Sequence, residues 1–416
     1  MNWNWSELGN RFEHPSGILD LMEDLGEAMS QGSSDLCMLG GGNPAQIPEV
    51  QQVFRKQWNE LGAQKRLDEV LGAYDTAQGS PIFHEALADY LNQKYDWGLT
   101  AENIGICNGS QTAFYQLFNL FADASKQILL PLSPEYIGYA DQGISPNLFR
   151  SVHGSLEQTD THLFKYHVDV DALPVSEGVA AMAVSRPTNP TGNVLTDQEI
   201  HHLSEVALRH RIPLFIDNAY GAPFPGILFK EVTPFWAPHV ILTLSLSKLG
   251  LPGTRTGIVI ADKPVIKRLT SMNTVVGLAN GNIGQALAAP LLVNGKIDQL
   301  CSEVIRPYYQ DHSQRAGKLW EEALGNSVPW MRHEAEGSMF HWLRFPGIPG
   351  GSRGLYERLK EKQVLVIPGD CFFYGLDAPA AEQHECIRVH TAMNAAKVEQ
   401  GIGIIAETVK EIYSGS

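Results

Sequence analysis

Apolar and polar positions in the middle of the chain follow two different periods. Short runs of β-branched and aliphatic residues, each bounded by turn-forming residues, indicate buried strands. These runs lie at residues 104–107, 127–132, 180–185, 213–216, 240–242 and 257–261. Around them apolar residues recur at helical spacing, as at Phe114, Leu117 and Phe121. Strands that alternate with helices predict an α/β fold with a mostly parallel sheet and helices on both of its faces.

The pattern is different at the two ends of the chain. After about residue 300 come a long helical stretch (301–324), an alternating segment (338–343), strands at 364–367 and 387–390, and a closing helix. Near the start, apolar residues at helical spacing predict a helix within 15–30. We therefore expect a large α/β domain at 46–299. A smaller, discontinuous α+β domain should comprise 1–45 and 300–416.

Charge and composition restrict the partners of this chain. It has 416 residues and a formal net charge of −15. Faces that bind nucleic acid or acidic membranes are basic, so we expect neither partner. No apolar run approaches the roughly 18 residues that span a bilayer. The five cysteines are scattered without a CxxC pair, and the first residues lack a secretory signal, so we expect a reducing, cytoplasmic location.

The clearest chemical signal is a lysine at the end of a buried strand. Lys248 follows the run at 240–242 and the hydroxyls of Ser245 and Ser247, and Arg255 comes after a Leu-Pro-Gly turn. Hydroxyls and a guanidinium suit a phosphate dianion, whereas a partly desolvated lysine attacks a carbonyl carbon to form a Schiff base. Phosphate and aldehyde on one ligand point to pyridoxal 5'-phosphate. A solvated lysine at a strand end is the alternative interpretation.

Further polar residues stand just past other predicted strands, namely Ser110, Tyr136, Asn189 and Asp217. Each has an ordinary explanation when taken alone. Ser110 can be a helix N-cap, Asn189 a turn residue, and Asp217 a cap of the next element. In an open α/β sheet, however, ligands bind beyond the carboxyl ends of the strands. The joint occurrence of these residues with Lys248 therefore favours one shared site.

A set of short motifs carries a family resemblance. They are Gly42-Asn43-Pro44, Gly109-Ser110-Gln111, the segment from Arg186 to Gly192, the segment from Asp217 to Tyr220, the segment from Ser245 to Lys248, the segment from Leu251 to Arg255, and Ile387-Arg388-Val389. In type and order they resemble the class I/II aminotransferases, which are fold type I pyridoxal-phosphate enzymes. The resemblance covers residues 39–391 and departs from the family at Asn43, where Glu is usual. It implies a fold type I transferase with pyridoxal 5'-phosphate as cofactor.

The resemblance also implies roles at the cofactor. Lys248 would carry the Schiff base and act as the general base once released. Asp217 would face the pyridine nitrogen and keep it protonated. Asn189 and Tyr220 would donate to the phenolate oxygen, and Tyr136 would stack on the ring. The phosphate ligands would be Ser110, Gln111, Ser245, Ser247 and Arg255.

At the substrate, the resemblance implies that Arg388 binds the α-carboxylate with its two parallel donors, with Gly42 and Asn189 nearby. Taken alone, Tyr74 is a surface aromatic. The resemblance implies instead that it reaches the phosphate in the neighbouring subunit, and hence that the enzyme is a homodimer with shared active sites. No metal is expected at this site.

Within the family, the chain most resembles enzymes that exchange an amino group between valine and pyruvate. This implies that L-valine and pyruvate give 3-methyl-2-oxobutanoate and L-alanine by a ping-pong mechanism. Dicarboxylate-specific relatives carry a second arginine in the stretch that corresponds to residues 269–305, and here that stretch contains none. We therefore expect small neutral amino acids and keto acids as substrates.

Two other functions remain open at this point. An α,β-lyase of the carbon–sulfur type would use nearly the same site residues. A ligand-sensing domain of a transcription regulator would share the fold, but it would need a DNA-binding module ahead of it. Only about 40 residues precede the Gly-Gly-Gly segment here, and the acidic charge also opposes DNA binding.

Overall fold

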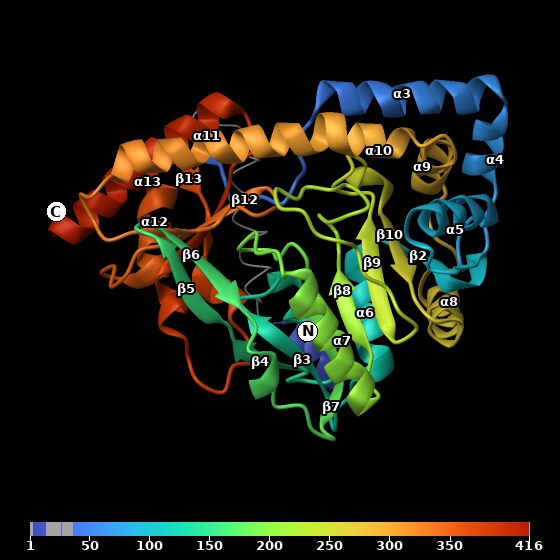
Figure 1. Ribbon diagram of the computed structural model, residues 1–416, viewed down its shortest axis with the longest axis horizontal. Coiled ribbons are helices and arrows are strands. Elements are labelled where there is room, and N and C mark those ends of the chain that lie inside the picture. Colours follow the sequence, from blue (N-terminus) through green and yellow to red (C-terminus); the bar gives the residue numbers. More distant parts are fainter. Residues whose placement is uncertain (1–2, 14–25, 27–35, 416) are drawn as a thin grey trace.

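The larger of the two main sheets organises the molecule (Figure 1). The structure is a computed structural model that describes residues 3–13, 26 and 36–415. Seven strands lie in the order β2-β10-β9-β8-β7-β3-β4. They are β2 (Ile104–Asn108), β3 (Gln127–Ser133), β4 (Phe149–His153), β7 (Val179–Ser185), β8 (Leu214–Asp217), β9 (Val240–Ser245) and β10 (Thr256–Ile260). Only β10 runs antiparallel to its neighbours, so the mostly parallel sheet that the sequence predicts is confirmed.

Helices cover both faces of this sheet because its strands are apolar on both sides. Successive residues of a strand point to opposite faces. Ile128 and Leu130 of β3 join a core with α6 (Ser110–Phe121) and α8 (Lys263–Gly277). Leu129, between them, joins the core that contains α5 (Pro81–Tyr95), α7 (Asp197–His210) and α9 (Ile283–Val293). This double burial explains why the strands read as continuous apolar runs.

A second sheet has six strands in the order β14-β15-β12-β11-β6-β5. These strands are β5 (Ser155–Asp160), β6 (Leu163–His167), β11 (Met331–His333), β12 (Phe340–Arg344), β14 (Ile367–Pro368) and β15 (Cys386–His390). The hairpin of β5 and β6 lies within the range 46–299. It nevertheless pairs with β11, so this segment belongs to the same sheet as strands from the end of the chain.

Helices complete the molecule around the second sheet. A nearly continuous helical run includes α10 (Lys296–Gln299), a π-helical turn at Leu300–Ile305 and α11 (Arg306–Leu324), and it passes along one edge of the molecule (Figure 1). The other helices are α1 (Glu7–Arg11), α3 (Pro48–Ala63), α4 (Arg66–Gly72), α12 (Gly351–Glu361) and α13 (Ala395–Ser414). Among the residues that are described, no helix is both long enough and apolar enough to cross a membrane.

Three segments differ from the pattern expected from sequence or lie beyond it. The helix predicted within 15–30 falls almost entirely outside the described residues. The strands between residues 149 and 167 were not predicted; of these, β5 is largely exposed and polar and β6 is largely buried. The strand predicted at 364–367 is divided into β13 (Val364–Leu365), which pairs with β1 (Cys37–Met38), and β14, which pairs with β15.

Candidate active site

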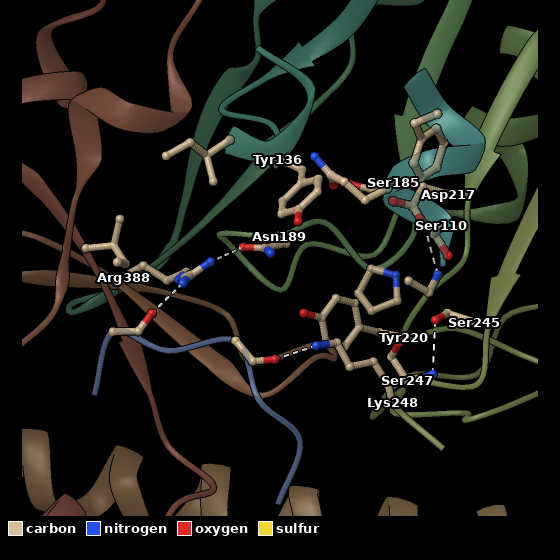
Figure 2. Close-up of a pocket in the computed structure, with 18 of the residues that line it drawn as sticks. Ser110, Tyr136, Ser185, Asn189, Asp217, Tyr220, Ser245, Ser247, Lys248 and Arg388 are labelled. Carbon is tan, nitrogen blue, oxygen red and sulfur yellow. Dashed lines mark hydrogen bonds between the residues drawn. The ribbon is translucent and has the colours of Figure 1, made fainter. Parts of the chain in front are cut away.

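A cavity of about 270 Å³ lies beyond the carboxyl ends of the parallel strands. It is lined by every residue that the sequence analysis assigned to the site, with the exception of Tyr74. These residues are Gly42, Ser110, Gln111, Tyr136, Asn189, Asp217, Tyr220, Ser245, Ser247, Lys248, Arg255 and Arg388. Figure 2 shows Arg388 on one side of this space and Lys248, Ser245 and Ser247 on the other. The cavity thus brings together strand ends of the larger sheet, Arg388 of the second sheet and the segment at Gly42.

Asp217 ends β8 at the floor of the cavity. One carboxylate oxygen accepts a hydrogen bond of 2.6 Å from the phenol of Tyr139, and the other accepts one of 3.0 Å from the backbone N–H of Ala219. Burial raises the pKa of Asp217, and the hydrogen bond from Tyr139 acts against that rise. Asp217 is thus a fixed buried carboxyl that can receive a positively charged donor.

Lys248 follows β9 and extends into the cavity. Its amine donates to the carbonyl of Gly42 at 2.5 Å and lies 5.3 Å from the ring centroid of Tyr220. Burial lowers the pKa of Lys248 to about 7, and the positive charges of Arg388 and Arg255 contribute to this shift. A large fraction of the amine is therefore neutral and nucleophilic at neutral pH.

A cradle for an anion forms where β2 leads into α6. Gly109 is the N-cap residue with φ of 86°, and Ser110 is the first helical residue. The N-cap interpretation of Ser110 is therefore wrong, because its hydroxyl caps nothing and instead points to the carbonyl of Leu244 at 3.4 Å. A Cβ atom on Gly109 would lie 2.0 Å from Nη2 of Arg255. The glycine thus allows the guanidinium to lie against the helix N-terminus, where the positive dipole end favours anions.

The other residues of the cradle are only partly committed to protein contacts. The hydroxyl of Ser245 accepts a hydrogen bond of 3.1 Å from the backbone N–H of Ser247. The side-chain amide of Gln111 donates to the carbonyl of Gly138 at 2.7 Å, so one of its donors is already used. Hydroxyls, a guanidinium and free N–H groups at a helix start make a dianion site.

Arg388 lies on the opposite side of the cavity, in β15. It donates to the side-chain oxygen of Asn189 and to the carbonyl of Gly40, both at 2.7 Å. Its guanidinium lies 4.1 Å from the ring centroid of Phe340 and 5.2 Å from that of Phe372. Burial lowers the pKa of Arg388 to about 10, so the group stays charged at neutral pH. Its Nε is buried without a partner, which leaves a donor that can bind a further acceptor.

Tyr136 and Tyr220, the two tyrosines expected at the cofactor ring, both line the cavity. Tyr136 meets Tyr139 edge to face, with a centroid distance of 5.2 Å, and its carbonyl accepts a hydrogen bond from Tyr374. Burial raises the pKa of Tyr220 well above its ordinary value, so its phenol keeps its proton and can act as a donor.

Tyr74 lies outside the cavity. Its side chain is 83 % exposed and lines a separate surface hollow with residues of α5 and α9. The described chain therefore does not bring Tyr74 to the other site residues.

Comparisons with known proteins agree with this geometry. The family described as aminotransferase class I and II matches residues 37–405. The chain belongs to this family. It is 42 % identical to the valine–pyruvate aminotransferase of Escherichia coli (strain K12) over 99 % of each chain. A crystal structure of the valine–pyruvate aminotransferase from Salmonella typhimurium LT2 superimposes with a TM-score of 0.89 at 41 % identity, covering 96 % of this chain and 100 % of that one.

A further solved structure, from Psychrobacter arcticum 273-4 and assigned as an amino-acid aminotransferase, covers both chains fully with a TM-score of 0.96 and 42 % identity. The fold is thus that of the fold type I aminotransferases, and the cofactor of this aminotransferase is pyridoxal 5'-phosphate. The cavity fits that cofactor. It offers a neutral amine for the aldehyde at Lys248, a carboxyl for the ring nitrogen at Asp217, and a dianion cradle that a Cβ on Gly109 would fill.

Several residues of this aminotransferase line the cavity without having been predicted. Ser185 ends β7, Ile137 follows Tyr136, and Ile367 lies in β14 next to Arg388. Ser185 carried a usable signal, since it ends a predicted strand as Asp217 does. Ile367 carried none, because only the pairing of β14 with β15 brings it to the site.

Proposed function

We propose that this aminotransferase transfers the amino group of L-valine to pyruvate, giving 3-methyl-2-oxobutanoate and L-alanine in a ping-pong reaction. The observation that carries the proposal is the full-length identity of 42 % with a valine–pyruvate aminotransferase. Relatives that are named for aromatic or acidic amino acids match at 20–26 % identity. The lining of the cavity supports the same substrate class.

The proposed chemistry uses groups that the cavity already positions. Pyridoxal 5'-phosphate supplies an electron sink for the bond that breaks at the substrate Cα. Lys248, with a pKa of about 7, would hold the cofactor through its aldehyde and, once released, would move the proton from Cα as a general base. Asp217 would stabilise positive charge at the ring nitrogen, and Asn189 and Tyr220 would donate to the ring oxygen. Tyr136 would stack on the ring, and the phosphate would be held by the cradle residues Ser110, Gln111, Ser245, Ser247 and Arg255.

Substrate binding is proposed to centre on Arg388. Its planar guanidinium matches a carboxylate with two parallel hydrogen bonds, and Asn189 and the backbone at Gly42 lie beside it. Among the described residues that line the cavity, the cations are Lys248, Arg255 and Arg388. Each of them has a proposed partner, so none remains for a second carboxylate.

Apolar residues occupy the rest of the lining, including Ile137, Pro187 and Ile367. A buried carboxylate without a partner costs several kcal/mol, whereas each buried methylene gains about 0.8 kcal/mol. The cavity should therefore reject aspartate and glutamate strongly. It should discriminate only modestly among valine, 2-aminobutyrate and alanine.

The test is kcat/KM for valine, alanine and glutamate with one common keto acid. Valine or alanine should exceed glutamate by at least about a hundredfold. Glutamate as the best donor would contradict the proposed substrate class and leave only the family assignment. A half-reaction checks the reaction type: amino acid without keto acid should convert the bound cofactor to its pyridoxamine form, whereas a lyase would release product and retain the original spectrum.

We also propose that the enzyme is a cytoplasmic homodimer. Tyr74 is exposed, and exposed apolar side chains lie nearby in sequence and structure, including Leu71 in α4 and Val275 and Val276 in α8. Figure 1 shows α4 and α8 on the same side of the molecule, away from the second sheet. A second copy that packs there would bury these residues. It would also bring Tyr74 to the cofactor phosphate that the other subunit binds.

Mixing two defective variants tests this arrangement. Tyr74→Ala and Lys248→Ala, unfolded and refolded together at limiting cofactor, should recover about a quarter of wild-type activity, because half of the dimers are mixed and each holds one native site. No recovery, or a monomer in sedimentation, would contradict the shared site.

A further inference from the structure

A second carboxyl group lies beneath the cavity, and the chemistry above does not use it. Glu135 follows β3 and is 2 % exposed. Its oxygens accept hydrogen bonds from the backbone N–H and the hydroxyl of Ser185, at 2.7 and 2.6 Å, and from the backbone N–H of Tyr136 at 2.9 Å. Three donors around one carboxyl favour its ionised form and act against the effect of burial.

Glu135 and Asp217 are both neighbours of Ser185 in space. Ser185 of β7 and Asp217 of β8 are paired neighbours in the sheet, and Ser185 bonds Glu135 on its other side. Burial raises the pKa of Glu135 to about 8 against the hydrogen bonds from Ser185, and the charge of Asp217 adds to the rise. The two carboxyls are thus electrostatically coupled through the floor of the site.

The titratable groups that face Glu135 from the surrounding elements are acidic or phenolic. They are Asp217 from β8, Tyr139 from the turn after Tyr136, and Tyr374 from the segment before β15. Within the described chain, no lysine, arginine or histidine forms an ion pair with Glu135. The charge of Lys248 acts on Asp217, where it opposes the rise in pKa. A positive charge that arrives beside Asp217 would therefore meet two carboxyls.

We propose that Glu135 is a positioning residue that ionises behind Asp217 when a positive charge arrives at the site, so that both carboxyls stabilise the protonated ring nitrogen of the bound cofactor. This inference rests on the proposed contact between Asp217 and that nitrogen. Glu135 touches neither the cofactor nor the substrate. It acts through Ser185, through the Tyr136 turn and through the low-dielectric space between the two carboxyls.

The measurement is the protonation of the ring nitrogen in the holoenzyme as a function of pH. Cofactor labelled with ¹⁵N at that position reports the proton by its chemical shift, independently of turnover. Glu135→Gln keeps the shape of the side chain and removes the charge, so it should lower the pH at which the nitrogen loses its proton by about one unit. Glu135→Asp keeps the charge and should restore most of that shift.

A matched control separates charge from structure. Tyr374→Phe removes a hydrogen bond of 2.8 Å to the carbonyl of Tyr136, in the same turn, without a change in charge. It should leave the titration of the nitrogen in place. If Glu135→Gln titrates as wild type does, or if Tyr374→Phe shifts the titration equally, the proposal is overturned. Glu135→Met provides a second neutral variant should Glu135→Gln not fold.

Asp217→Asn distinguishes a failure of the role of Glu135 from a failure of the proposed contact between Asp217 and the ring nitrogen. A large loss of ring protonation in Asp217→Asn, together with no shift in Glu135→Gln, would overturn the role of Glu135 alone. If Asp217→Asn also leaves the nitrogen unaffected, the proposed contact between Asp217 and the ring fails as well.

Discussion

At the scale of single residues, the amine of Lys248 is poised between its charged and neutral forms. Burial lowers its pKa to about 7, so the neutral fraction of the amine grows as pH rises through this region. Only the neutral amine attacks an aldehyde. The rate at which apoenzyme captures the cofactor covalently should therefore rise as pH passes through 7 and then level off. Absorbance after rapid mixing measures it, and Lys248→Ala should show no capture at any pH.

Arg388 tests whether guanidinium geometry, and not charge alone, binds the substrate. Arg388→Lys keeps the charge but loses the parallel pair of donors and the stacking between Phe340 and Phe372. The loss of one charge-assisted hydrogen bond, about 1.5–3 kcal/mol, should raise KM for valine roughly tenfold to hundredfold. A carboxylate inhibitor should weaken in parallel. Arg255→Lys is the comparison, since it should weaken cofactor binding and not substrate binding; equal KM for both variants and wild type would refute the assignment.

At the scale of elements, the junction of β2 and α6 depends on a glycine. A Cβ at Gly109 would lie 2.0 Å from Arg255, and φ there is 86°. Gly109→Ala should therefore displace the guanidinium from the cradle and add backbone strain of about 1–2 kcal/mol. We expect the dissociation constant of the cofactor to rise at least about tenfold, as measured by equilibrium titration of apoenzyme.

The control for this prediction lies in the turn before Arg255. A Cβ at Gly253 would have no atom within 4 Å, and Gly253 does not need a positive φ. Gly253→Ala should bind the cofactor as wild type does. Cofactor affinity that is equally unaffected in Gly109→Ala would show that Arg255 does not need its place at the helix start.

At the scale of the whole molecule, a buried ion pair of the second sheet binds a loop of the larger sheet. Lys165 of β6 and Glu336, between β11 and β12, form a salt bridge in the interior. Lys165 also donates to the side-chain oxygen of Asn193 at 2.8 Å, and Glu336 accepts from the backbone N–H of Val194 at 2.8 Å. Asn193 and Val194 lie in the loop that follows β7 of the larger sheet. The cluster thus holds the loop that carries Asn189 against the second sheet.

Removal of the carboxylate should be costly because it leaves a buried ammonium without its counter-charge. Glu336→Gln should lower the free energy of unfolding by about 3–5 kcal/mol at pH 7, as measured by urea denaturation. Glu102→Gln disrupts an exposed pair with Lys263 and should leave the urea midpoint within error. A small effect of Glu336→Gln would show that the two sheets are held together by their apolar contacts alone.

The same pair predicts how stability depends on pH. Burial acts to raise the pKa of Glu336, but Lys165 and the hydrogen bonds outweigh it, so the folded pKa lies below the ordinary value of 4.5. A carboxyl with a lowered pKa contributes stability above its unfolded pKa and loses that contribution as pH falls through the folded one. Wild-type stability should therefore fall more steeply below pH 4.5 than that of Glu336→Gln.

Much of the site follows from the sequence by itself. The buried strands are continuous apolar runs because both faces of the larger sheet are covered, and that local signal locates their ends. Polar residues at those ends, such as Asp217 and Lys248, must then gather at one edge of a parallel sheet. The ordered motifs add the family and its cofactor. The proposed roles of the individual residues, and the division into domains at residue 299, stay predictions.

Tertiary structure decided what depends on neighbours that are distant in sequence. The hairpin β5–β6 joins the second sheet because β6 pairs with β11, a pairing between segments far apart in sequence that the local pattern does not indicate. Tyr74 lies outside the cavity. Glu135 bonds Ser185, and Ser185 lies beside Asp217 because β7 and β8 are neighbours in the sheet. Sequence periodicity states which face of an element is apolar, but it does not state which element covers that face.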